Sequence, residues 1–105
     1  MYDRLQAVED RYDELNELLS DPNVVSDAKK LRDYSKEQSA ITETVETYRE
    51  YKEVTTGLAE TREMMNEKLD DDMKEMVKEE FNELTAEKKP IRGALKTIAR
   101  SKRPE

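Results

Sequence analysis

Residues 20–27, SDPNVVSD, interrupt a chain that has helical hydrophobic periodicity on both sides. Proline lacks an amide hydrogen and disfavours the α conformation in the residue before it, so Pro22 predicts the end of the preceding helix. Ser26 is expected to cap the next helix by accepting a hydrogen bond from a free backbone amide, and Asp27 adds negative charge at the positive helix end. Val24 is expected to fold back onto the helices, with Val25 as a second candidate for this contact. The stretch therefore predicts a turn between two helices.

The segments on either side of this turn both predict amphipathic helices. Before the turn, from about 2 to 19, apolar residues recur at alternating steps of three and four, which suits lengthwise packing on another helix. They are Leu5, Val8, Tyr12, Leu15 and Leu19. After the turn a similar periodicity continues from about 27 to 69, with Gly57 as a weak point where the helix is expected to bend or fray but to continue.

Three successive aspartates at 70–72 predict the end of the second helix and the start of a third, because aspartate favours caps and first turns. A calcium loop is disfavoured, since the EF-hand spacing is absent. The third helix has an apolar stripe formed by Met73, Val77, Phe81 and Leu84. Pro90 is expected to interrupt this helix. A short basic amphipathic segment containing Ile91, Leu95 and Ile98 would follow it.

These patterns predict an all-α fold, either a three-helix antiparallel bundle or a long helical hairpin, with coiled-coil-like packing. No alternation of apolar and polar residues indicates a strand. Two apolar clusters are expected in the core. The first contains Leu15, Leu19, Leu31, Tyr34, Ile41 and Val45, and the second contains Leu58, Met65, Met73, Val77 and Phe81.

The composition limits the functions open to the chain. Charged residues make up 43% and hydrophobic residues 34%, so the core must be thin. Cysteine and histidine are both absent, which removes thiolate metal sites and the commonest general base. No apolar run is long enough to span a bilayer, and no signal peptide is recognisable. The expectations are a cytoplasmic location, no cofactor, no metal site and no membrane partner.

Charge is divided unevenly along the chain. The net charge is −7, yet residues 88–105 hold seven basic residues and one acid. The basic residues are Lys88, Lys89, Arg92, Lys96, Arg100, Lys102 and Arg103. They are candidates for contact with RNA phosphates. A membrane surface, or a solvated basic helix end that neutralises nearby acids, explains the same pattern.

Three blocks of the sequence resemble, in order and spacing, the N-terminal domain of bacterial class I peptide chain release factors. The blocks are RYDELNELLSDPNVVSDAKKLRDYSKEQSAI (11–41), ETVETYREYKEV (43–54) and DDDMKEMVKEEFNEL (70–84). The type that reads UAA and UAG fits better than its UGA-reading sibling, which tends to carry tryptophan at the position of Val25. The likeness fades after Leu84. The expected division is therefore a release-factor-like helical domain at 1–87 and a diverging basic segment at 88–105.

The resemblance implies a role in translation termination, in which a stop codon is recognised and peptidyl-tRNA is hydrolysed on the ribosome. The implied module does neither. It is a helical arm that contacts the stalk base of the large subunit and the rest of the release factor. The Gly-Gly-Gln and Pro-x-Thr tripeptides that the family uses for hydrolysis and codon reading are absent from this sequence, so the chain is not expected to be an enzyme.

A second function stays open on the sequence alone. A thin core and an exposed apolar stripe also suit a standalone helical adaptor or a coiled-coil dimerisation protein. Self-association is a candidate property of the chain when it is isolated from its neighbours.

Overall fold

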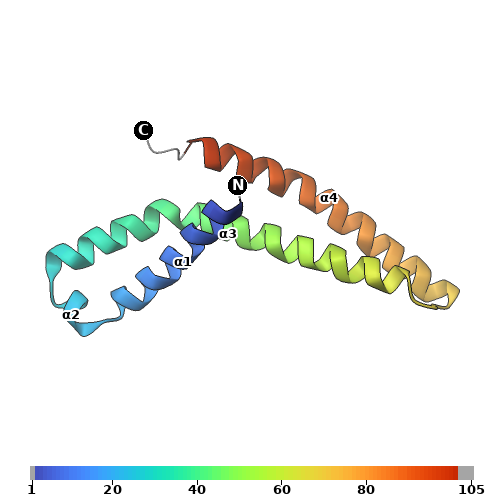
Figure 1. Cartoon of the computed structure of the whole chain (residues 1–105), viewed down its shortest axis with the longest axis horizontal. Coiled ribbons are helices and arrows are strands. Elements are labelled where there is room, and N and C mark those ends of the chain that lie inside the picture. Colours follow the sequence, from blue (N-terminus) through green and yellow to red (C-terminus); the bar gives the residue numbers. More distant parts are fainter. Residues whose placement is uncertain (1, 102–105) are drawn as a thin grey trace. The chain divides into compact units, whose positions relative to one another are not determined.

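A computed structural model describes the backbone of residues 2–101 and the side chains of residues 2–98. This part of the chain is almost entirely helical, and it contains no strand. The helices are α1 (Tyr2–Leu19), α2 (Pro22–Val25), α3 (Ala28–Met65) and α4 (Asp71–Ser101) (Figure 1). No helix within the described range has the length and apolar character needed to cross a membrane. The all-α prediction and the three long helices are confirmed.

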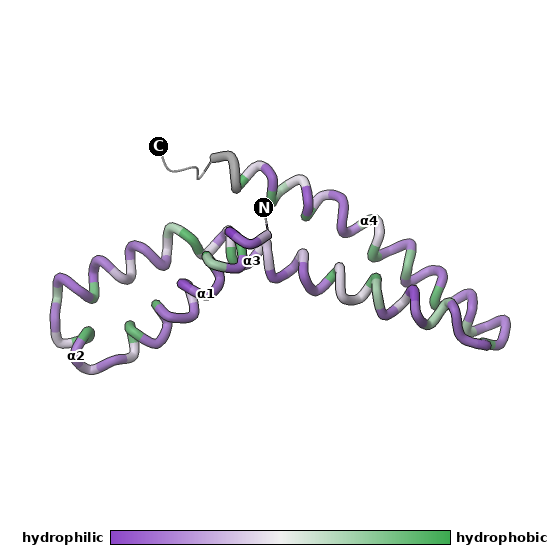
Figure 2. Tube along the Cα trace, viewed as in Figure 1, coloured by the Kyte–Doolittle hydropathy of each residue, from purple (hydrophilic) through white to green (hydrophobic). Residues whose placement is uncertain are grey.

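Two compact units make up the chain, one ending at Tyr48 and the other starting at Arg49. The long helix α3 contributes its first part to one unit and its last part to the other. Each unit is a helical hairpin. Figure 2 shows hydrophobic residues recurring singly between hydrophilic ones along the long helices, as expected for narrow apolar stripes.

In the first unit, α1 packs along the first part of α3. Its buried apolar side chains are Leu5, Leu15, Val24, Val45 and Tyr48. The Tyr48 hydroxyl donates a hydrogen bond to Gln6 Oε1 at 3.2 Å, which links the two helices at the edge of this core. The predicted first cluster is present with Leu15 and Val45 fully buried, while its other four members are only half-buried.

The turn at 20–27 differs from the prediction because it contains a helix of its own. Asp21 caps α2 by accepting a hydrogen bond from the Asn23 amide at 2.9 Å, and Pro22 occupies the first helical turn, where its missing amide hydrogen costs nothing. Val24, in α2, is buried as expected. Proline here starts a helix as well as following the end of one.

The prediction that Ser26 caps α3 is wrong. Asp27 Oδ1 accepts the amides of Lys29 and Lys30 at 3.1 and 3.2 Å, so Asp27 is the capping residue. Ser26 instead ends α2, where its amide donates to the Pro22 carbonyl at 3.0 Å. A carboxylate caps as well as a hydroxyl does and adds the favourable charge, so the helix starts one residue later than expected.

Replacing Asp27 with alanine is expected to destabilise the chain by about 1 kcal/mol, because two amides lose their acceptor. The matched variant Ser26→Ala removes only a 3.4 Å bond to the Asn23 carbonyl and should change the free energy of unfolding by much less. Urea unfolding followed by circular dichroism measures both. Equal losses, or a larger loss for Ser26→Ala, would show that the caps are assigned wrongly.

An interhelical ion pair joins α1 to α3 in the first unit. Arg11 donates from Nε to Glu37 Oε2 at 2.6 Å and from Nη2 to Glu37 Oε1 at 2.8 Å, and it also pairs with Glu14. The guanidinium carbon lies 5.9 Å from the centre of the Tyr34 ring. The hydrogen bond from Arg11, assisted by its charge, holds the pKa of Glu37 below its ordinary value.

This shift predicts the pH dependence of the pair. A carboxyl whose pKa is lowered in the folded state adds stability above its unfolded pKa and loses that contribution as pH falls through the folded value. Both side chains are more than a third exposed, so the contribution is small. In an NMR titration of the Glu37 carboxyl, Arg11→Gln should raise the midpoint, whereas Lys29→Gln should not. An unchanged midpoint in Arg11→Gln would contradict the pairing.

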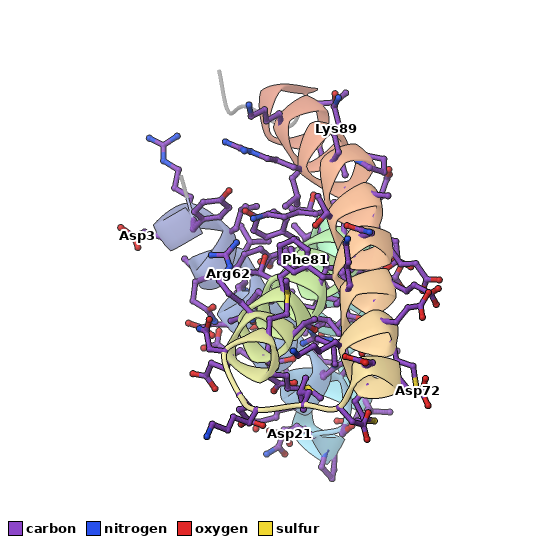
Figure 3. The ribbon with its side chains drawn as sticks, turned by 90° about the vertical axis from the view of Figure 1, so that its right-hand side faces the viewer. Asp3, Asp21, Arg62, Asp72, Phe81 and Lys89 are labelled. Carbon is purple, nitrogen blue, oxygen red and sulfur yellow. The ribbon has the colours of Figure 1, made fainter. Side chains whose placement is uncertain are left out.

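In the second unit, the last part of α3 packs on α4. Its buried side chains are Val54, Leu58, Thr61, Val77, Leu95 and Ile98. The predicted cluster is confirmed at Leu58 and Val77, and Phe81 is half-buried with the Arg62 guanidinium 5.7 Å from the centre of its ring (Figure 3). Helix α3 continues through Gly57 as expected. A Cβ there would lie 3.2 Å from Leu84 Cδ1, so glycine permits close approach of α4.

The predicted burial of two members of the second cluster is wrong. Met65 is 47% exposed and Met73 is 39% exposed. Met65 is the last residue of α3 and Met73 lies in the first turn of α4, so neither has a further helical turn opposite it to cover its side chain. Helix α3 also ends four residues before the expected limit at 69. Asp70 then caps α4, as predicted, by accepting the Met73 amide at 2.8 Å.

The expected interruption at Pro90 is also wrong. Helix α4 continues through it to Ser101. Proline in a helix interior removes one backbone hydrogen bond and clashes with the preceding turn, at a cost of about 3 kcal/mol. The helix persists because its apolar stripe stays in phase on both sides, and Leu95 and Ile98 beyond the proline are buried. Burial of two such side chains is enough to offset that cost.

Candidate nucleic-acid interface

The basic residues of the C-terminal segment lie on α4, and their spacing decides how they are arranged. In a helix with about 100° per residue, Lys89, Arg92 and Lys96 fall within about 60° of the circumference. All three side chains are exposed. We call these three residues the basic strip. Lys89 is labelled on α4 in Figure 3.

The other four candidate residues do not belong to the described part of this strip. Lys88 is half-buried, and its Nζ lies 5.8 Å from the centre of the Tyr51 ring, so this ammonium group packs on an aromatic face inside the hairpin. Arg100 lies in α4 by its backbone, but its side chain is outside the described residues. Lys102 and Arg103 lie wholly outside them.

The electrostatic setting of the strip is simple. From residue 88 to 101 the sequence has five basic residues and no acid. Cations near the C-terminal end of a helix are favoured by the helix dipole, which accounts for part of this pattern without any partner. Exposed lysine and arginine side chains in a row are also what phosphate groups require. The strip is thus chemically able to contact a nucleic-acid backbone.

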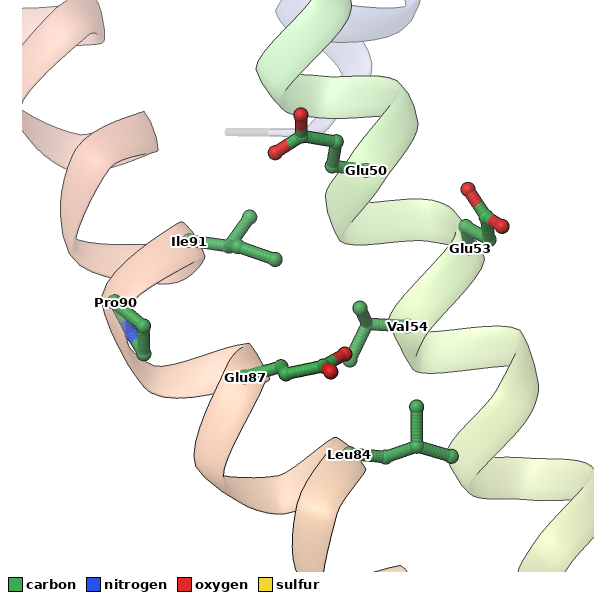
Figure 4. A pocket seen from close by; sticks show the side chains of 7 residues that line it. All are labelled: Glu50, Glu53, Val54, Leu84, Glu87, Pro90 and Ile91. Carbon is green, nitrogen blue, oxygen red and sulfur yellow. The ribbon is translucent and has the colours of Figure 1, made fainter. Parts of the chain in front are cut away.

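A second feature of this unit is not predicted by the sequence analysis. A groove of about 480 Å³ is lined by Glu50, Glu53 and Val54 from α3 and by Leu84, Glu87, Pro90 and Ile91 from α4 (Figure 4). Its aliphatic residues include members of the stripes already recognised, but its glutamates resemble ordinary solvated positions. The spacing of three between the two glutamates on α3 is the only signal in the sequence that they share a face.

A comparison with known protein families shows which family the chain belongs to. The model of the PCRF domain matches residues 8–105 of the chain. The chain belongs to the PCRF domain family. The match covers all three blocks on which the resemblance to release-factor N-terminal domains rests, and that resemblance is confirmed.

Full-length relatives of this PCRF domain are closely similar to it. Peptide chain release factor 1 of Listeria welshimeri and that of Listeria innocua are each 68% identical over 104 residues, which are 99% of this chain and 29% of the relative. Peptide chain release factor 1 of Lysinibacillus sphaericus is 60% identical over the same length. The chain therefore spans less than a third of the relatives it matches. No solved structure matches it.

The basic strip lies inside the matched PCRF range, which continues to residue 105. The expectation that residues 88–105 diverge from the family gains no support from this match. The boundary expected at 87 falls within α4. The proposed division at that position stays a prediction.

Proposed function

We propose that this chain is the N-terminal helical domain of a peptide chain release factor and acts in translation termination. The observation that carries the proposal is the 68% identity to Peptide chain release factor 1 over nearly the whole chain, together with the PCRF match. The UAA- and UAG-reading type is favoured by the name of these relatives and by the valine at position 25. The location that follows from this role is the cytoplasm.

The domain's contribution is contact without chemistry. The relatives are more than three times as long as this chain, which covers 29% of their length, so stop-codon recognition and ester hydrolysis are assigned to the remainder of such a protein. The two adjacent glycines that the family's hydrolytic tripeptide requires do not occur in this sequence. The partners that the release-factor resemblance implies are the ribosome, at the stalk base of the large subunit, and the rest of the release factor.

RNA contact through the basic strip is part of this proposal. The support is the exposure of Lys89, Arg92 and Lys96 on one side of α4, and the absence of acids from 88 to 101. The acidic remainder of the chain would be repelled by phosphates, so orientation on RNA would depend on this strip. Arg100, Lys102 and Arg103, whose side chains lie outside the described residues, stay candidates for the same contact.

The test is a ribosome-binding measurement with the purified chain at several salt concentrations. Changing Lys89, Arg92 and Lys96 together to glutamine should weaken binding and flatten its salt dependence. The slope of the logarithm of the binding constant against the logarithm of salt concentration should fall by about one for each phosphate that is no longer neutralised.

The matched control for the strip changes Lys68, Lys74 and Lys78 to glutamine. These three lysines are exposed near the other end of the same unit, so the control removes the same charge from the chain. It should leave ribosome binding and its salt dependence nearly unchanged. Equal weakening by both triple variants would mean that ribosome binding depends on the net charge of the chain and not on the basic strip.

A further inference from the structure

The groove on the second unit has a floor suited to aliphatic side chains. Val54 is 7% exposed and belongs to the core, whereas Leu84 and Ile91 are half-buried and Pro90 is exposed. Figure 4 shows the side chains of Leu84 and Ile91 directed from α4 toward α3, on which Val54 lies. The volume of about 480 Å³ falls within the range of pockets that hold organic ligands or several side chains.

The rim of the groove carries one sign of charge. Glu50 and Glu53 on α3 and Glu87 on α4 line it, and all three are exposed. None of the three makes an ion pair or a hydrogen bond through its side chain within the described residues. The neighbouring cation on α4, Lys88, lies over the Tyr51 ring. The three carboxylates of the rim therefore have no ion-pair partner among the described residues, and the basic strip lies on another side of α4.

The aliphatic floor and the acidic rim together favour one class of occupant. An aliphatic floor between carboxylates is complementary to lysine or arginine flanked by aliphatic residues, because the long stems of these side chains pack on apolar surface while their charged ends reach the rim. A nucleic acid is disfavoured by repulsion from the carboxylates. Among the described residues no group of three or more acidic side chains is arranged to hold a metal ion. The occupant that complements this groove is both cationic and apolar.

We propose that this groove is the docking site for a basic amphipathic helix of a partner protein. One face of that helix would place leucine- or isoleucine-like residues on Val54, Leu84 and Ile91. Its flanking lysines or arginines would pair with Glu50, Glu53 and Glu87. The inference rests on the groove alone and does not depend on the release-factor assignment or on the basic strip.

The test measures binding of a synthetic amphipathic helical peptide of leucine and lysine to the purified chain by fluorescence anisotropy. Changing Glu50, Glu53 and Glu87 together to glutamine should weaken binding by about tenfold, since it removes three exposed ion pairs. The control triple variant changes Glu60, Glu79 and Glu80, which are exposed on the same two helices, and should leave binding nearly unchanged. Both variants remove the same charge from solvent-exposed positions.

Several outcomes would overturn the proposal. Equal weakening in both triple variants would mean that the peptide responds only to the acidic body. Binding of a leucine–glutamate peptide as tightly as the leucine–lysine peptide would remove the charge argument. Dimerisation of the chain alone, abolished by the Glu50, Glu53 and Glu87 changes, would assign the groove to a second copy.

An NMR titration locates the bound peptide on the chain. Shifts at Val54, Leu84 and Ile91 on peptide addition are expected, because these side chains form the floor of the groove. Shifts confined to residues outside the groove would contradict the proposal even if the peptide bound tightly.

Discussion

The Leu15→Ala variant is expected to lose about 2–5 kcal/mol of unfolding free energy, the cost of deleting a fully buried leucine. Leu15 has no exposed surface and lies in the core of the first unit with Val45. Small domains have a total stability of about 5–15 kcal/mol, so this single change removes a large share. A thin core makes each of its few members important.

Amide hydrogen exchange in α1 and the first part of α3 measures this loss locally, and urea unfolding measures it globally. The control is Val25→Ala, because Val25 is 50% exposed and its truncation leaves no cavity. Its effect should stay within about 0.5 kcal/mol. Similar protection in Leu15→Ala and the wild type would show that α1 does not pack through this residue.

The Pro90→Ala variant is expected to stabilise the second unit by about 2 kcal/mol. Alanine would restore the amide hydrogen that the Ala86 carbonyl lacks in α4 and would remove the steric clash of the ring, together worth about 3 kcal/mol. Part of this gain is offset, because proline also restricts the unfolded chain, by about 0.4–1 kcal/mol. The net change is therefore a gain.

A second proline supplies the matched control. Pro22 occupies the first turn of α2, where proline is favoured and no amide hydrogen is needed. Pro22→Ala should therefore give no gain, or a small loss. Urea unfolding of both variants decides the matter. If Pro90→Ala were neutral or destabilising, α4 would not be a continuous helix through residue 90.

Hydrophobic spacing was enough to predict the three long helices. The apolar stripe from Leu5 to Leu19 predicts α1 at its observed bounds, because steps of three and four place apolar residues on one face only in an α-helix. Local chemistry was less decisive at the turn. Asp21-Pro22 is compatible with a helix stop and with a helix start. The amides of Val25 and Ser26, which donate to the carbonyls of Asp21 and Pro22, show that a helix starts there.

Local helix propensity gave a wrong prediction where the burial of distant side chains outweighed it. Pro90 opposes a helix locally, but Leu95 and Ile98 are buried only if α4 continues, and their burial depends on residues far away in the sequence. At Met73 the error is the reverse, because the helix is predicted correctly but the side chain is exposed. Its place on the stripe is correct, but the stripe cannot reveal that the facing helix has already ended at Met65.

In the candidate sites, features that depend on one helix were predictable, and features that depend on the packing of two helices were not. The strip formed by Lys89, Arg92 and Lys96 follows from helix geometry, so its arrangement was predictable once α4 was known to continue. The packing of Lys88 on Tyr51 was not, since it needs the register between α3 and α4. The groove combines both helices and therefore has no signature in either segment alone.

The intact mass of the endogenous protein, captured from its own cells with an antibody to residues 1–40, distinguishes a domain of a longer protein from a free helical arm. We expect a species several-fold heavier than 12.3 kDa, since this chain corresponds to 29% of its relatives' length. Such a mass would place the domain at the start of a complete release factor. A species at 12.3 kDa would contradict that assignment, because the cell would then make the helical arm alone.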